Sequence, residues 1–130
     1  NFKQPVWADE FKKELSKSKM ALNLSQGNPL KFYSSDRIAQ LIGNGILTFV
    51  DIKTQLNKIF KNDEVVFYKN INDLLKQIIL LKDDNKKRNR IAEKGMKKYH
   101  KFMNSKIVSE FIINKTLNIN RHKKFFWENK

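Results

Sequence analysis

The sequence contains no cysteine, which excludes disulfide bonds and metal sites built on thiolates. It has only four glycines and two prolines among 130 residues, and no Gly-, Ser- or Pro-rich linker, internal repeat or low-complexity stretch interrupts it. No apolar run is long enough to cross a membrane, and the first residues lack the charged-then-apolar pattern of a signal peptide. These absences fit a cytoplasmic protein, and association with a membrane surface stays open.

The length suits one folded domain with a modest core. Apolar residues make up 40% of the chain, a fraction typical of a globular domain rather than of a disordered one. Asn1 stands at the first position in place of Met, so we expect the chain to be a piece of a longer protein.

Positive charge dominates the composition, with 27 Lys and Arg against 13 Asp and Glu and a net charge of +14. This balance invites a nucleic-acid interpretation. However, the excess is nearly all lysine and accompanies frequent Asn, Ile and Phe, whose codons are all rich in A and T. A biased genome therefore explains the charge without a nucleic-acid partner. Residues 86–106 hold nine Lys and Arg with Glu93 alone, and we interpret them mainly as a solvated helix face.

Short apolar runs alternate with helical periodicity along the chain. Buried strands are predicted at residues 20–24, 46–50 and 65–68. The first predicted helix covers residues 5–17, with proline in its first turn, and the second is capped by Ser34 or Ser35 and stops at Gly43-Asn44-Gly45. A helical turn capped by Thr54 and a helix capped by Asn70 or Asn72 follow. A basic helix opens near Asp84 or Asn85, and a last helix carries Ile107, Val108, Phe111 and Ile112. Strands that alternate with helices predict an α/β fold with a parallel sheet and a helical C-terminus.

The candidate site lies in the stretch from Lys31 to Gly45. Its helix begins with Ser34, Ser35, Asp36 and Arg37, so backbone N–H groups, hydroxyls and a guanidinium gather in one small volume. That combination suits a phosphate or a ribose. Parallel sheets bind ligands at the carboxyl ends of their strands, and polar residues follow all three predicted strands, at 25–27, at 51 and at 68–70.

Simpler interpretations exist for the same residues. Ser34 and Ser35 could only cap the helix, and Arg37 could form a surface ion pair with Asp36 or Asp51. Glycines 43 and 45 fit a tight helix-to-strand turn better than a ligand cradle. His100 has no neighbouring Ser, Asp or second His that would give it a triad or metal role, and no metal-ligand spacing occurs in the sequence.

The segment Arg37-Ile-Ala-Gln-Leu-Ile-Gly-Asn-Gly45 resembles the "R-x-F-E-A-M-A-C-G" helix of GT-B glycosyltransferases, closest to the group 1 enzymes and their spore-maturation-protein-like branch. Further pieces are similar to that family in order and spacing. They are Ala21-Leu-Asn-Leu-Ser25, Glu64-Val-Val-Phe-Tyr68, Asn72-Asp-Leu-Leu75, and Arg90-Ile-Ala-Glu-Lys-Gly95 with Tyr99-His100. The resemblance runs from about Leu15 to Ile113.

The resemblance implies a partial Rossmann-like, nucleotide-sugar-binding domain over residues 1–117 and a basic tail over 118–130. The donor-binding residues would be Ser25, Lys31, Ser34, Ser35, Asp36, Arg37, Gln40 and Gly45, with the diphosphate at 34–37 and the ribose at Gln40. Two positions depart from the family pattern, since Gln40 and Phe32 stand where its glutamates fall. A glutamine lacks the charge that strengthens a carboxylate–hydroxyl contact.

The implied activity is transfer of a sugar from a nucleotide-diphosphate sugar to a glycan or cell-envelope acceptor. No cofactor or metal is implied, because the nucleotide sugar is the substrate. The acceptor and any general base would belong to a missing N-terminal domain, so this chain alone is expected to catalyse nothing.

Two other functions stay open. A basic module could bind nucleic acid or an anionic membrane through residues 86–106 and Phe125-Phe-Trp127, although no nucleic-acid motif occurs. A different α/β nucleotide- or phosphate-binding domain, such as a response-regulator-like fold, is the second alternative. Against it, this sequence has no acidic cluster at the end of its first predicted strand.

Overall fold

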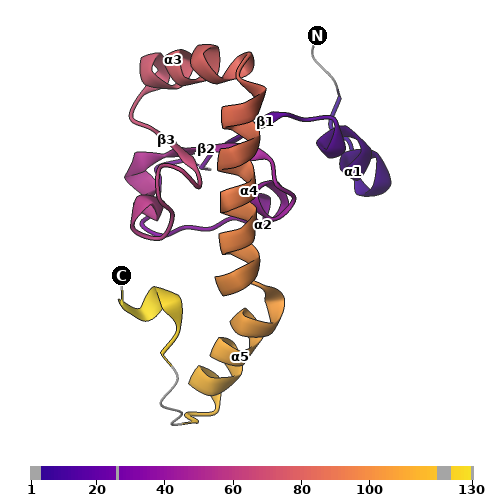
Figure 1. The fold of residues 1–130 in the computed structure, drawn as a ribbon. Coiled ribbons are helices and arrows are strands. Elements are labelled where there is room, and N and C mark those ends of the chain that lie inside the picture. Colours follow the sequence, from indigo (N-terminus) through magenta and orange to yellow (C-terminus); the bar gives the residue numbers. More distant parts are fainter. Residues whose placement is uncertain (1–3, 26, 120–123, 130) are drawn as a thin grey trace.

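Three parallel strands form the sheet at the centre of the computed structural model, which describes residues 4–25, 27–119 and 124–129 (Figure 1). They are β1 (Met20–Asn23), β2 (Leu47–Asp51) and β3 (Val66–Tyr68), in the order β1-β2-β3. Leu22 pairs with Phe49, and Val50 pairs with Phe67. The predicted parallel sheet and the α/β class are confirmed, with each strand within one residue of its expected bounds.

The two connections between the strands differ. α2 (Asp36–Gly43) joins β1 to β2, whereas two short 3-10 helices, η1 (Ile52–Thr54) and η2 (Leu56–Lys58), join β2 to β3. The expected helical turn after Thr54 is therefore confirmed in 3-10 form, and the Thr54 hydroxyl accepts a hydrogen bond from the N–H of Leu56 at 3.4 Å.

Alternate strand residues separate the core into two layers, as the period of a strand requires. Val50 and Phe67 pack with Ile38 and Ile42 of α2 on one face. The other face carries Leu47, Phe49, Val66 and Tyr68, packed under α3 (Ile71–Lys82) and the first half of α4 (Asn85–Phe102). The apolar residues of strands and helices thus meet at two interfaces, which accounts for the predicted buried runs.

α1 (Ala8–Ser16) begins three residues later than predicted. Trp7 is its N-cap residue, so Pro5 precedes the helix and the expectation of proline in the first turn is wrong. None of the helix residues is buried, and Trp7 is 79% exposed. Phe11 and Leu15 are half-buried and line a hollow against α2 rather than entering the core.

The ends of the other helices follow their local sequence. The side chains of Asn70 and Asp84 accept hydrogen bonds from Asp73 N and Lys87 N, as N-cap residues do. α2 ends in a Schellman turn, in which Gly45 N donates to Ile42 O and Ile46 N to Leu41 O. Gly45 has a φ of +71°, a backbone conformation that favours glycine, so the predicted glycine stop is confirmed.

α4 crosses the amino edge of the sheet. Gly95 lies so close to the turn before β3 that a Cβ atom would come within 2.3 Å of the Glu64 carbonyl oxygen. One helical turn further, Lys98 Nζ lies 2.6 Å from a carboxylate oxygen of Glu64, with the two side chains 13% and 15% exposed. Met96 faces the turn before β2, 3.2 Å from a Cβ built on Gly45. The helix therefore packs on this edge at the turns before β2 and β3.

Arg88 is a buried cation without a carboxylate partner among the described residues. Its guanidinium donates to the carbonyl oxygens of Leu81 and Lys82, both at 2.7 Å, and to the side chain of Asn85. The acceptors at the C-terminus of α3 carry the negative end of the helix dipole, which favours a cation there. Arg88 thus fixes the angle between α3 and α4.

The C-terminal aromatic residues pack back on the helices. α5 (Ser105–Thr116) continues from α4 and buries no residue, so the expected inward face is only half-buried at Ile107 and Phe111. Phe125 is buried against Phe111, and Phe126, in η3 (Phe126–Asn129), stacks on Phe102 with ring centroids 4.6 Å apart. The boundary between residues 117 and 118 stays a prediction, and residues 120–123 and 130 of the predicted tail lie outside the described residues.

Replacing Gly95 with alanine should destabilise the protein. In an exposed helix this change would add up to about 1 kcal/mol of stability. Here the methyl group would overlap the Glu64 carbonyl oxygen, and such overpacking costs about 1–3 kcal/mol. Urea unfolding of Gly95→Ala should show this loss. Gly43→Ala is the matched control, because its Cβ would sit at an ordinary 3.5 Å from Tyr99 and should be neutral or stabilising. Equal stability of the two variants would contradict the packing at Gly95.

Replacing Arg88 with methionine should lower the free energy of unfolding by about 2–4 kcal/mol. Methionine keeps much of the apolar stem but removes the charged donor, and hydrogen bonds to charged groups contribute about 1.5–3 kcal/mol. Arg90→Met, on the exposed side of α4, should change stability by no more than about 0.5 kcal/mol. The same small effect at both positions would show that Arg88 does not hold the two helices.

Candidate functional site

The carboxyl edge of the sheet brings together the end of β1 and the N-terminus of α2. Asn23, the last residue of β1, is 3% exposed, and its side-chain oxygen accepts a hydrogen bond from Ser35 Oγ at 3.1 Å. Ser35 is the N-cap residue of α2, yet its side chain makes no capping hydrogen bond. The serine thus ties α2 to the strand, while the cap leaves the first-turn N–H groups of Asp36 and Arg37 to another acceptor.

Arg37 lies on the exposed side of the first turn of α2. Its Nη1 donates to the carbonyl oxygen of Leu24 at 3.1 Å. The alternative ion pairs with Asp36 or Asp51 do not occur in the part of the chain that the structure describes. The guanidinium is therefore held beside the helix N-terminus by a neutral acceptor and keeps its full positive charge available to an anion.

The loop before α2 turns back over the η1 segment. Phe32 N donates to Thr54 O at 2.8 Å, and Phe32 has a φ of +59°, which is uncommon for a bulky residue. Lys31 Nζ lies 5.2 Å from the centroid of the Phe32 ring. Lys31 and Ser34 are exposed in this loop, which leads from the carboxyl edge of the sheet to α2.

The remaining predicted residues are placed differently. Ser25 is half-buried after β1, whereas Gln26 beside it lies outside the described residues. Gln40 is exposed one turn along α2 and faces the hollow shared with Trp7 and Phe11 of the first segment. Gly45 lies at the other end of α2, by the amino edge. The structure thus brings seven of the eight predicted donor-binding residues to α2 and the preceding loop, and sets Gly45 apart.

The ends of β2 and β3 complete the edge. Asp51 accepts hydrogen bonds from Lys53 N at its carboxylate, 2.8 Å, and from the Thr54 hydroxyl at its carbonyl oxygen, 2.7 Å. Burial raises the pKa of Tyr68 above its ordinary value, and the Asp51 carboxylate raises it further. Tyr68 therefore stays a neutral hydroxyl, and Asp51 shapes the turn after β2.

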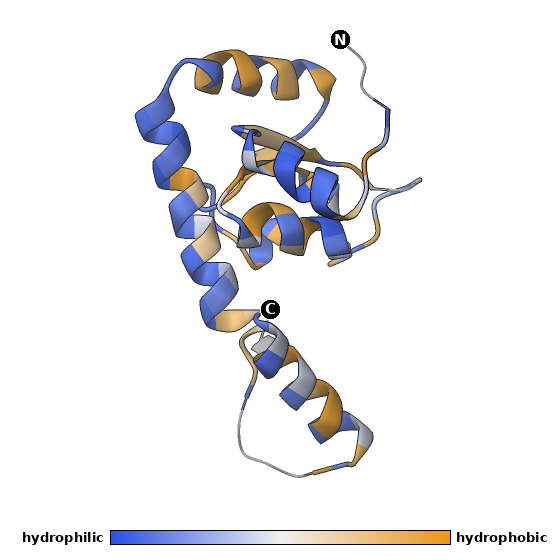
Figure 2. Ribbon diagram, turned by 90° about the vertical axis from the view of Figure 1, so that its right-hand side faces the viewer, coloured by the Kyte–Doolittle hydropathy of each residue, from blue (hydrophilic) through white to orange (hydrophobic). Residues whose placement is uncertain are grey.

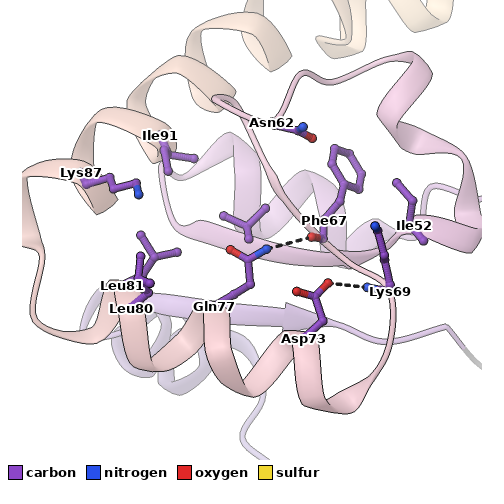
Figure 3. A pocket seen from close by; sticks show the side chains of 11 residues that line it. Ile52, Asn62, Phe67, Lys69, Asp73, Gln77, Leu80, Leu81, Lys87 and Ile91 are labelled. Atoms are coloured by element: carbon purple, nitrogen blue, oxygen red, sulfur yellow. Dashed lines mark hydrogen bonds between the residues drawn. The ribbon is translucent and has the colours of Figure 1, made fainter.

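Another hollow, of about 440 Å³, lies away from α2, between β3, α3 and α4 (Figure 3). Two of its polar side chains form hydrogen bonds with the backbone around it. Asp73 accepts from Lys69 N at 2.9 Å, and Gln77 donates to Phe67 O at 3.4 Å. These two bonds hold α3 to the free edge of β3, which is a structural role.

Neither a metal site nor a membrane span is found in the described ranges. They contain no group of three or more His, Asp or Glu side chains placed to hold a metal ion. None of their helices combines the length and the apolar character that crossing a bilayer requires. His100 lies with Nε2 at 2.8 Å from the carbonyl oxygen of Gly43, so it joins α4 to the end of α2.

Sequence reasoning missed two contributors to this edge. Asn23 was treated only as part of a strand, although an amide inside a buried apolar run is a signal that it has a partner. Trp127 lies more than ninety positions after Phe32 in the sequence, and both line one small pocket with Ser34. No local pattern could have paired them.

One of three comparisons with known proteins gave a match. The model of the family described as "Glycosyl transferase-like" matches residues 1–114, which include the whole sheet, α2 and α4. Neither the curated proteins nor the solved structures gave a match. Because the family model covers most of the chain, the protein belongs to the glycosyl transferase-like family.

Proposed function

We propose that the N-terminus of α2 binds the diphosphate of a nucleotide-sugar donor, in an enzyme that transfers the sugar to a glycan or cell-envelope acceptor. The observation that supports it is the use of Ser35. Its side chain donates a hydrogen bond to Asn23 and does not cap α2, so the first-turn N–H groups of the helix are left for another acceptor. The protein belongs to a glycosyl transferase-like family, and a donor diphosphate would be such an acceptor.

The transfer forms a bond between an acceptor oxygen and the anomeric carbon and breaks the bond from that carbon to the diphosphate. Negative charge therefore develops on the departing diphosphate. The positive end of α2, the guanidinium of Arg37 and the ammonium of Lys31 would stabilise that charge. Gln40, one turn along the helix, would donate and accept one hydrogen bond each with the ribose hydroxyls.

We assign the general base and the acceptor site to a further domain across the carboxyl edge. We therefore expect this chain alone to bind donor weakly and to transfer nothing. No resident cofactor is needed for the step.

The basic-module alternative loses support from the ion pairs of α4. Lys94, Lys97 and Lys98 lie within 2.7 Å of carboxylate oxygens of Asp63, Glu93 and Glu64. Half of the lysines on this helix are thus neutralised within the fold, which lowers the charge available for counterion release on a nucleic acid.

Titration with UDP or GDP should shift the NMR resonances of residues 34–37 and Gln40 more than those of α4. Backbone N–H groups that gain an anionic acceptor change their chemical environment strongly, whereas solvated lysines do not. Shifts confined to the lysines of α4 would mean non-specific charge attraction and would contradict the proposed site.

Replacing Arg37 with glutamine should weaken UDP binding about ten- to a hundred-fold. A charge-assisted hydrogen bond in a partly desolvated site contributes about 1.5–3 kcal/mol, at about 1.4 kcal/mol per decade. Arg90→Gln, an exposed arginine of α4, is the control and should leave the dissociation constant unchanged. In the longer protein the same change should lower turnover by a similar factor. An unchanged affinity for UDP in Arg37→Gln would remove this residue from the site.

A further inference from the structure

A small apolar pocket of about 260 Å³ adjoins the proposed diphosphate site. It lies between the loop before α2, the turns after β2, the C-terminal end of α4 and the C-terminal aromatic segment. Five of its six lining residues are apolar, and the sixth is Ser34: Phe32, Ser34, Leu56, Ile59, Met103 and Trp127. The pocket therefore touches the candidate site through a single hydroxyl.

The wall that Trp127 supplies is held in place by other aromatic rings. Trp127 stacks on Phe125, with centroids 5.6 Å apart, and meets Phe111 edge-on at 5.4 Å. Phe125 is itself buried. The C-terminal aromatic residues thus have a defined place beside the site, although the sequence offered them only as part of a basic tail.

Two cations lie beside Phe32, one of the residues that line this pocket, and we infer that they form its rim. Lys31 Nζ lies 5.2 Å and Lys58 Nζ 5.9 Å from the centroid of the Phe32 ring. Within the described ranges neither lysine forms an ion pair with a carboxylate. The pocket thus joins an apolar interior to a rim of uncompensated positive charge.

This chemistry selects among ligands. A sugar ring or a nucleobase buries several donors and acceptors, each of which needs a partner, and the interior offers only the Ser34 hydroxyl. A hydrocarbon chain needs none. A phosphate at the end of such a chain would meet the two lysines at the rim.

We propose that the pocket binds a lipid phosphate, with part of its alkyl or prenyl chain against Phe32, Met103 and Trp127 and its phosphate between Lys31 and Lys58. As a binding site this stands on the pocket alone. Ser34 lies between this pocket and the proposed donor site, and the acceptor of the transfer stays assigned to the further domain.

The test uses Trp127 as its own reporter. The chain has two tryptophans, and Trp7 is far from this pocket, so Trp7→Phe leaves Trp127 as the only indole. Its fluorescence is titrated with decyl phosphate below the micelle concentration, with decanol and with inorganic phosphate. We expect a saturable change with decyl phosphate, at least ten-fold weaker binding of decanol, and no change with inorganic phosphate. Octyl phosphate should bind more weakly by about four-fold per lost methylene.

Lysine-to-glutamine variants distinguish binding at the pocket from non-specific attraction of an anion to a basic protein. Lys31→Gln and Lys58→Gln should each weaken decyl phosphate about five-fold without changing decanol. Lys86→Gln, an exposed lysine of α4, is the matched control and should change neither. Far-UV circular dichroism checks that these surface variants keep the fold.

Three results would overturn the inference. They are an equal effect of Lys86→Gln, no dependence on chain length, and a response only to anionic vesicles, which would indicate contact with a membrane surface instead. The UDP titration gives an independent answer. Loss of UDP binding with decyl phosphate binding retained would remove the donor site but leave the lipid-phosphate site. Loss of decyl phosphate binding with UDP binding retained would remove only the lipid-phosphate site.

Discussion

The contact between α4 and the turn before β3 is the constraint on which the arrangement of this protein depends. Only a glycine at position 95 lets the helix backbone come this close to the Glu64 carbonyl oxygen, and Lys98 then reaches the Glu64 side chain from the next turn. In this position α4 runs along the molecule from α3 to α5 and passes both layers of the core (Figure 1). It packs on the amino edge of the sheet, whereas the loops of the proposed donor site lie at the carboxyl edge.

The carboxyl edge is organised by polar groups that satisfy one another before any ligand arrives. Burial of Asn23 is tolerated because Ser35 donates to its side chain, and that bond takes the serine away from its capping role. Arg37 is oriented by a carbonyl oxygen and therefore stays uncompensated. An anion-binding helix terminus and a cation next to it are thus consequences of how the first strand is joined to α2.

Lysine and aromatic side chains of the C-terminal half form contacts within the fold. The ammonium of Lys98 lies 5.6 Å from the Phe60 ring and 5.4 Å from the Phe126 ring, while its carboxylate partner neutralises it. Figure 2 shows polar and apolar residues interspersed along α5, in keeping with a helix that buries no residue. The aromatic residues after α5 instead return to α4 and to the pocket beside α2.

The sequence by itself determined the strands and the turn at Gly45, because each depends on residues within a few positions of one another. For the caps of α3 and α4 it left neighbouring candidates, and the structure selects Asn70 and Asp84. The sequence also carried the family likeness, which lies in the same local segments. The tertiary structure alone decided the partners of Ser35 and Arg37, the place of Arg88 at the end of α3, and the meeting of Phe32 with Trp127. A side chain with several neighbours to choose from takes the one that burial and distance favour. That choice depends on segments far apart in the chain, which no local pattern records.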